Sequence, residues 1–471
     1  MKQLRPFHIF LFMCCCMLLL AAICYLMPST SHWFGNEIRT PQLTEVLELE
    51  ADSALTTTTT TTTPISECSE ATTTTTTTTT ECPEAPTTKA PTTESPKAPV
   101  IDSIDYSVDT RMFLSVFYES LQQADSMPIR VVHYGDSQIE GDRITMQVRR
   151  ACQQQYGGGG VGLIPLHQTI SMRTVSQTTM MNGEVQQTGE GPKRYMIYGP
   201  KSNRLPNGKG ANYGPMGHVA YMDDSLVAGS EDISVQIKPT GKDKQPESYF
   251  NRVRILQSGD ITTTVHSSFI KNDNVYAIAD STSYLRIDFK GKGEVYGISL
   301  ENDHGVTVDN IPMRGCAGTI FTSLSSKQLK DYFSQTSTRL IIMQFGGNVM
   351  PYTDQEKEVT QYVRRIRNQV QLMKRLAPNS SILFVGPSDM IERKSGQLRT
   401  YAMLPFMEQS LRKMAIEEQI GYFSIFEAMG GEGGMIRWKE QGLAGSDYVH
   451  FTRKGADKVG EILAEWLLKQ D

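Results

Sequence analysis

The stretch Val131-Val132-His133-Tyr134-Gly135-Asp136-Ser137-Gln138-Ile139 decides how this chain folds. It begins with β-branched residues typical of a buried strand, which Gly135 ends. Apolar residues at helical spacing follow from Ile144 to Cys152, so Ser137 is predicted at a strand-to-helix turn. Its N–H would then lie at a helix start, which favours negative charge and suits a nucleophile whose attack creates an oxyanion. The alternative is a serine that only caps the helix.

Two further stretches carry the partners that such a nucleophile needs. Asp447-Tyr448-Val449-His450 places a carboxylate three residues before a histidine, so one short loop can present both side chains and let the carboxylate orient the imidazole. Gln344-Phe345-Gly346-Gly347-Asn348 follows an apolar run, 340–343, that reads as a strand. His133 shares a strand face with Gly135, and we expect it to be structural.

Together the three stretches resemble the sequence blocks of the SGNH (GDSL-type) hydrolases: a Gly-Asp-Ser block, a Gly-Gly-Asn block and an Asp-x-x-His block, in the same order. The resemblance implies that Ser137 is the nucleophile, that His450 is the general base and that Asp447 orients it. Each block alone is a weak signal, whereas three in order, each at the end of a predicted strand or loop, make a strong one.

The same resemblance implies three donors to the oxyanion. They are the N–H of Ser137, the side-chain amide of Asn348 and a glycine N–H in the segment 313–319, which we assign to Gly318 with Gly315 as the alternative. The chain departs from the family pattern at Gln138, Cys316 and Val349. None of these departures removes a proposed catalytic atom.

A closer resemblance within the family is to the peptidoglycan O-acetylesterases whose SGNH domain carries an inserted carbohydrate-binding-like β domain. It covers nearly all of 101–471 and implies removal of acetyl esters from the 6-hydroxyl of muramoyl residues. The matching segments are His133–Ser137 with Gly141-Asp142, Gly159–Gly162, Gly297–Glu301, and Trp438 with Gly442–Ala444.

The expected fold class is α/β: an SGNH-hydrolase-like parallel sheet with helices on both faces, plus an inserted all-β sandwich domain. Strand and helix patterns alternate in 100–166 and 303–471, the two parts of the hydrolase domain, and active sites of such sheets lie at the carboxyl ends of the strands. Between them, 167–302 shows short β-type runs separated by Gly, Pro, Asn and Asp. Aromatic residues of this segment could stack on sugars, but packing in the core or across strands is the more common role. The aromatic residues in question are Tyr195, Tyr198, Tyr213, Tyr221, Tyr249 and Phe250.

The N-terminal segment predicts export. Residues 1–27 contain an uncharged apolar run, Phe7 to Leu26, long enough to span a bilayer, with Lys2 and Arg5 before it. We favour an uncleaved inner-membrane anchor that places the enzyme in the periplasm; a cleaved signal peptide, giving a periplasmic or secreted protein, is the alternative. Residues 28–99 are rich in Thr and Pro and are predicted to be a disordered spacer, in which Cys68 and Cys82 could pair with each other or with a second chain.

The composition of the chain limits which partners and cofactors we expect. The net charge of −5 and the lack of a long basic run give no reason to expect nucleic acid. The cysteine spacings match no zinc site, so we expect no metal and no other cofactor. The oligomeric state is left open.

The sequence therefore predicts an exported serine esterase that removes O-acetyl groups from a cell-envelope polysaccharide, with peptidoglycan favoured, through an acetyl-serine intermediate. An O-acetyltransferase with the same triad, or an esterase for another polysaccharide such as xylan, is the alternative. A non-catalytic glycan-binding module is the third hypothesis, and the intact triad argues against it.

Overall fold

The computed structural model describes residues 30–33, 36–39, 107–187, 191–201, 204–205, 212–222, 232–240, 245–394 and 396–469. The chain divides into two compact units, 1–92 and 93–471. In the first, β1 (Thr30–Trp33) and β2 (Asn36–Arg39) form an antiparallel hairpin within the predicted spacer. The expected anchor, the threonine runs and the two spacer cysteines lie outside the described residues. Within the ranges described, no helix is both long and apolar enough to cross a membrane.

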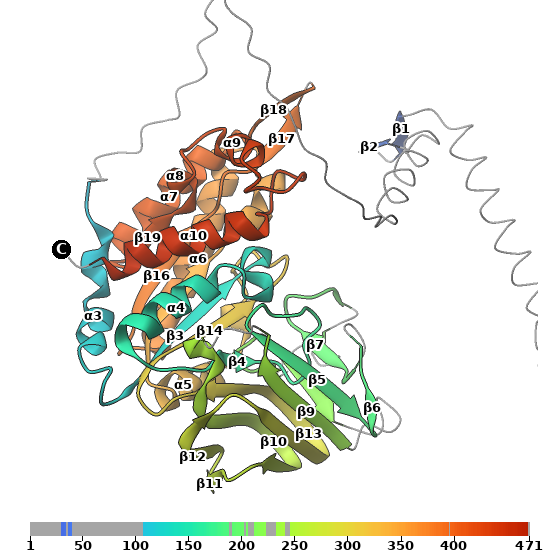
Figure 1. Ribbon diagram of the computed structural model, residues 1–471. Helices are drawn as coiled ribbons and strands as arrows, with labels where there is room; N and C mark the ends of the chain where they lie inside the picture. The colour runs from blue at the N-terminus through green and yellow to red at the C-terminus, as the bar shows by residue number, and fades with distance from the viewer. Residues whose placement is uncertain are drawn as a thin grey trace, which may run out of the picture. The chain divides into compact units, whose positions relative to one another are not determined.

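A parallel sheet forms the centre of the second unit (Figure 1). In spatial order its described strands are β14 (Gly305–Pro312), β3 (Pro128–Gly135), β15 (Thr338–Gln344), β16 (Ser381–Gly386) and β19 (Gly421–Ser424), each parallel to its neighbours. β3 lies between β14 and β15, so the β-branched run quoted above becomes an inner strand of the sheet. This position explains why the strand is buried at seven consecutive residues.

Helices cover both faces of this sheet. Along β3, Val131 packs into a core formed with one helix group, whereas Val132 and Tyr134 pack into the core on the opposite face. The first group is α3 (Ser115–Leu121), α4 (Thr145–Tyr156), α9 (Gly434–Glu440) and α10 (Arg453–Leu468). The second is α5 (Ser326–Gln335), α6 (Glu356–Leu376) and α7 (Leu404–Glu417). The short helix α8 (Ile425–Ala428) and the hairpin β17 (Ile391–Lys394) and β18 (Gln397–Thr400) complete this part.

The insert is antiparallel, as the sequence predicts, and lies beside the edge strand β14 (Figure 1). Hydrogen bonds join its ten described strands into one sheet, because β10 and β13 are long and pair with different partners along their lengths. The strands are β4 (Gly162–Ile164), β5 (Val175–Met181), β6 (Glu184–Val185), β7 (Arg194–Met196), β8 (His218–Met222), β9 (Asp232–Pro239), β10 (Phe250–His266), β11 (Ile270–Asn272), β12 (Val275–Thr282) and β13 (Leu285–Glu301). β4, which precedes the predicted start of the insert, pairs with the end of β13.

A buried ionic network joins the insert to the parallel sheet. Arg130 of β3 donates to Asp309 of β14 at 2.5 Å and also to Glu301 at the end of β13. Asp309 also accepts hydrogen bonds from the Tyr332 hydroxyl and from the backbone N–H of Leu163 in β4, the latter at 2.9 Å. Burial alone would lower the pKa of Arg130, but its acidic neighbours, Asp309 foremost, outweigh that effect and raise it. The guanidinium therefore stays charged in the interior.

Removal of one charge from this network should destabilise the fold. In Asp309→Asn, Arg130 stays buried with less negative charge around it, so we expect the free energy of unfolding to fall by about 3–5 kcal/mol. Urea unfolding followed by circular dichroism measures the change. The matched control is Asp331→Asn, because Asp331 pairs at 2.6 Å with Lys327 on the helix surface. This substitution should lower the free energy of unfolding by no more than about 0.5 kcal/mol. Equal losses in the two variants would contradict the proposed importance of the buried network.

Candidate active site

Ser137 lies directly beyond the carboxyl end of β3, as predicted, but not at the start of a long helix. A short 3-10 segment, Ser137–Asp142, follows it, and α4 begins only at Thr145. Gly141 and Asp142 both adopt positive φ, at 67° and 65°, and interrupt the helical path. The expected strand-to-helix turn is therefore present, but the helix that starts at the serine is this short 3-10 segment and not α4, so any favourable dipole at Ser137 comes from the short segment.

The structure brings the three predicted catalytic side chains together. Ser137 Oγ lies 2.9 Å from His450 Nε2, and His450 Nδ1 lies 2.7 Å from Asp447 Oδ2. The other oxygen of Asp447 accepts the backbone N–H groups of Val449 and His450 at 3.1 and 3.0 Å. Burial alone would raise the pKa of Asp447, but these hydrogen bonds outweigh it and hold the pKa below its ordinary value. The carboxylate therefore stays ionised and can orient the imidazole.

The loop that carries Asp447 and His450 is fixed by its own backbone. The N–H of Gly445 donates to the carbonyl of His450 at 2.7 Å, and Ala444 forms a bridge with Phe451. Thr452 then caps α10 by accepting the N–H of Gly455. The spacing of three residues between Asp447 and His450 thus belongs to a short closed loop next to a helix start.

Two side chains that the sequence analysis did not single out for a role connect this loop to the serine. Gln138 Nε2 donates to the carbonyl of Val449 at 2.7 Å. The Arg143 guanidinium donates to the carbonyl of Ser137 and, at 3.5 Å, to that of Phe451. The family pattern has leucine at the position of Gln138, and leucine could not make this bond. Only the fold shows these links, because they join positions more than 300 residues apart.

Asn348 lies at the site but is already hydrogen-bonded there. Its Nδ2 donates to Asp136 Oδ2 at 3.0 Å and to the carbonyl of Cys316 at 3.2 Å, which joins all three strand ends. Asp136 Oδ1 accepts the N–H of Gln138. Asp136 is only 5% exposed, and burial raises its pKa to about 6 despite these hydrogen bonds. An oxyanion would have to share the Asn348 amide with these acceptors.

Gly318 is in the wrong place for an oxyanion donor. Its N–H donates to Cys316 Sγ at 3.3 Å, and the glycine is buried against Phe345, where a Cβ atom would come within 2.5 Å of the ring. Gly318 is therefore required for packing. Gly315, the alternative, is exposed, has a positive φ of 74° and open space around it, and its N–H has no partner among the described residues. The geometry thus favours Gly315, a choice that depends on backbone conformation and was not visible in the sequence.

Ser137 and His450 stand between two hollows. One, of about 220 Å³, also contains Asn348 and the exposed Tyr352. The other, of about 430 Å³, is lined by four arginines that the sequence analysis did not identify: Arg143, Arg173, Arg314 and Arg453. An extended substrate can therefore pass the serine on both sides.

The remaining expected residues have structural roles or lie apart from the triad. His133 is fully buried between Gln344 and Thr145, and burial lowers its pKa to about 3, so it is a neutral packing residue as expected. Tyr195, Tyr213 and Phe250 are buried in the core, not exposed for sugar stacking. In the part of the chain that the structure describes, no group of three His, Cys, Asp or Glu residues could hold a metal ion.

Comparison with known proteins supports the architecture. Neither protein-family models nor curated protein sequences gave a match. Among solved structures, a peptidoglycan O-acetylesterase matches with a TM-score of 0.59 and 21% identity, over 77% of this chain and 96% of that one. An acetyl xylan esterase covers 34% of this chain and 79% of its own, with a TM-score of 0.24 and 10% identity. The periplasmic domain of a lipopolysaccharide acetyltransferase from Salmonella ser. Paratyphi A covers 36% and 74%, with a TM-score of 0.25 and 11% identity.

The first of these likenesses confirms the fold. The chain has the expected α/β architecture, an SGNH-hydrolase-like parallel sheet with helices on both faces and an inserted β domain. At 77% of the chain, the match extends beyond the parallel sheet and its helices into the insert. The solved structure with this likeness is that of a peptidoglycan O-acetylesterase.

The buried Asp136 makes stability depend on pH. The folded chain holds this proton up to about pH 6, whereas the unfolded chain releases it near 3.8, so unfolding releases a proton between these values. The contribution of Asp136 to the free energy of unfolding therefore decreases as pH rises through this window, by about 3 kcal/mol at 1.36 kcal/mol per pKa unit. Asp136→Asn lacks this decrease. In urea unfolding of both proteins from pH 4 to pH 7, the free energy of unfolding of the variant should rise relative to that of the wild type as the pH rises. A difference in free energy that does not change with pH would contradict the burial effect.

Proposed function

We propose that this protein is a serine esterase that removes O-acetyl groups from a cell-envelope polysaccharide, with peptidoglycan as the favoured substrate. The observation that carries the proposal is the chain of hydrogen bonds from Ser137 through His450 to Asp447 at the carboxyl edge of a parallel sheet. The fold shared with a peptidoglycan O-acetylesterase, including the insert, supports this choice of substrate. We further propose that the N-terminal apolar segment anchors the enzyme in the inner membrane, facing the periplasm.

The reaction follows from the geometry. His450 Nε2 takes the proton of Ser137 as Oγ bonds to the acetyl carbonyl carbon, and the carbonyl oxygen becomes an oxyanion. The oxyanion is stabilised by the N–H groups of Ser137 and Gly315 and by the amide of Asn348. Collapse breaks the bond to the sugar oxygen, which leaves with the proton from His450. Water then repeats the sequence on the acetyl-serine, releasing acetate and restoring Ser137.

Loss of the nucleophile should abolish this chemistry. Ser137→Ala and His450→Ala should keep the fold and lower hydrolysis of 4-nitrophenyl acetate by several orders of magnitude, with Asp447→Asn somewhat less affected. Ser171→Ala is the matched control, since Ser171 lines the arginine-rich hollow and has no hydrogen bond to His450 among those described. Turnover by Ser137→Ala at the wild-type rate would refute the hydrolase proposal. Acetate release from O-acetylated peptidoglycan and xylan, with and without a glycan acceptor, then identifies the polymer and separates hydrolysis from acetyl transfer.

Asn348 should act on turnover more than on binding. Asn348→Ala removes one oxyanion donor, which typically lowers kcat by about 10²–10³, with KM nearly unchanged. Steady-state kinetics on the same ester measures both constants, and a thermal melt shows whether the loss of the bond to Asp136 disturbs the fold. A defect confined to KM would mean that Asn348 binds the ground state instead.

A further inference from the structure

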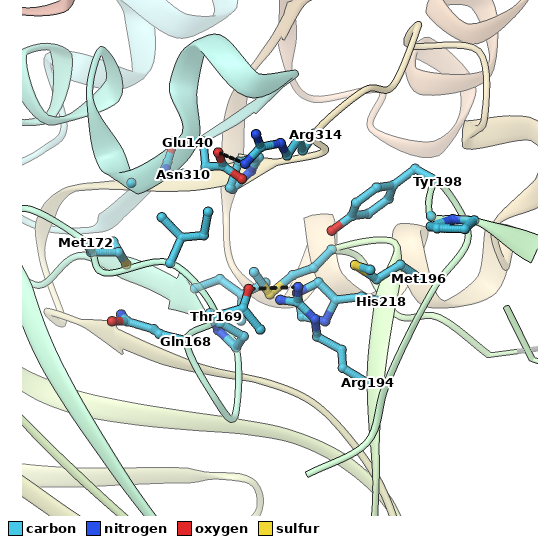
Figure 2. A pocket seen from close by; sticks show the side chains of 18 residues that line it. Glu140, Gln168, Thr169, Met172, Arg194, Met196, Tyr198, His218, Asn310 and Arg314 are labelled. Atoms are coloured by element: carbon cyan, nitrogen blue, oxygen red, sulfur yellow. Dashed lines mark hydrogen bonds and ion pairs between the residues drawn. The ribbon is translucent and has the colours of Figure 1, made fainter. Parts of the chain in front are cut away.

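A cavity of about 400 Å³ lies between the β domain and the carboxyl end of β14 (Figure 2). Arg194 and His218 come from β7 and β8 of the insert, whereas Asn310 and Pro312 belong to β14. Most of the remaining wall is apolar, with Leu163, Ile170, Met172, Met196 and Met216 among its residues. Neither the proposed reaction nor the packing of the core explains a cavity of this size.

Arg194 differs from the buried arginines of this structure. Arg130, Arg149 and Arg254 each pair with a carboxylate. Arg194 points into the cavity, and its one hydrogen bond within the described ranges goes to the hydroxyl of Thr169, at 3.0 Å (Figure 2). No carboxylate of the described residues pairs with it. The guanidinium therefore has donors left for an anion, and its planar fork suits a carboxylate.

Two buried polar side chains in the same wall each have an atom without a partner. His218 is 5% exposed and Gln168 is 9% exposed, and among the described residues neither His218 Nδ1 nor Gln168 Nε2 has a hydrogen-bond partner. A buried polar atom without a partner costs stability, so such atoms usually face a ligand or water. Burial foremost, and then Arg194, lower the pKa of His218 well below its ordinary value, so the imidazole is neutral. At this wall the cavity thus offers one charge that is not paired with a carboxylate and two neutral polar groups.

The cavity adjoins the catalytic serine. It shares Glu140, Gly141, Ile170 and Arg314 with the arginine-rich hollow that contains Ser137 and His450. Glu140 and Arg314 form an ion pair at 3.1 Å across the common wall (Figure 2). A substrate with its acetyl group at Ser137 can therefore place a neighbouring substituent in the cavity.

We propose that this cavity binds a carboxylate-bearing, otherwise apolar substituent of the glycan, with the carboxylate on Arg194. Both a hydroxy-acid ether and a short peptide have this chemistry. The inference rests on the proposed function for its glycan, and it assigns to the insert a direct part in choosing which acetylated sugar is bound. Apolar groups of the substituent would contact the methionines, and its polar atoms would bond with Gln168 and His218.

Binding of deacetylated fragments tests the inference without any turnover. The probes are a disaccharide with a free hydroxy-acid ether, the same disaccharide with a short peptide on that acid, and both compounds with their carboxylates converted to primary amides. Calorimetry with the full chain should show the acids binding about tenfold to a hundredfold more tightly than the amides, since a hydrogen bond to a charged group is lost in the amides. Whether the first acid or only the peptide shows this preference identifies the source of the carboxylate.

Variants of Arg194 complete the test. Arg194→Gln should remove the preference for the acids, and Arg194→Lys should restore part of it, because lysine keeps the charge but not the fork. Arg286→Gln is the matched control: this arginine of β13 pairs with Asp288 and lines neither cavity. Hydrolysis of 4-nitrophenyl acetate should be unchanged in all three. Equal binding of acids and amides by the wild type, a preference that survives in Arg194→Gln, or no binding at all would overturn the inference, whereas failed ester hydrolysis would overturn only the proposed function.

Discussion

The buried pair of Arg130 and Asp309 is the interaction on which the rest of the structure depends. A charge pair removed from water is costly unless its partners make further hydrogen bonds, as Arg130 does through both Nη atoms and Asp309 through both carboxylate oxygens. The pair joins β3 to β14, and through Glu301 and Leu163 it also holds both ends of the inserted sheet. One network therefore sets the position of two neighbouring strands and of the domain inserted between them.

The position of these strands determines where the residues of the candidate active site lie. Ser137 follows β3, the segment with Gly315 and Arg314 follows β14, and Asn348 follows β15. The bonds from Asn348 to Asp136 and Cys316 bring these three strand ends together. Because the network and these bonds both involve β3 and the chain of β14, a change in the insert's docking would alter both the candidate site and the cavity beside it.

Motifs with short internal spacing could be read from the sequence, whereas features made by docking could not. The alternation of apolar strands and amphipathic helices predicts the parallel sheet, and the Asp447–His450 spacing predicts the carboxylate–imidazole pair, because both are local. The choice between Gly315 and Gly318 depends on φ and on the Phe345 ring, which no motif reveals. The positive φ of Gly141 and Asp142, which lie between Ser137 and the start of α4, was likewise not predictable from a motif. Arg194 looks like any surface arginine until the fold places it in the wall of a cavity that β14 also lines.

The order of the strands has a consequence for how the chain reaches its native state. Arg130 and Asp309 are 179 positions apart, and β14 and β15, the strands that pair with β3 in the described residues, both come after the whole insert. β3 can therefore pair with its neighbours only when the chain beyond the insert has been brought next to it. Closing so long a loop costs conformational entropy, and this cost is smaller when the insert has already collapsed and shortened the distance. Pairing of the insert's antiparallel strands therefore lowers the entropic cost of bringing Ser137 and His450 together.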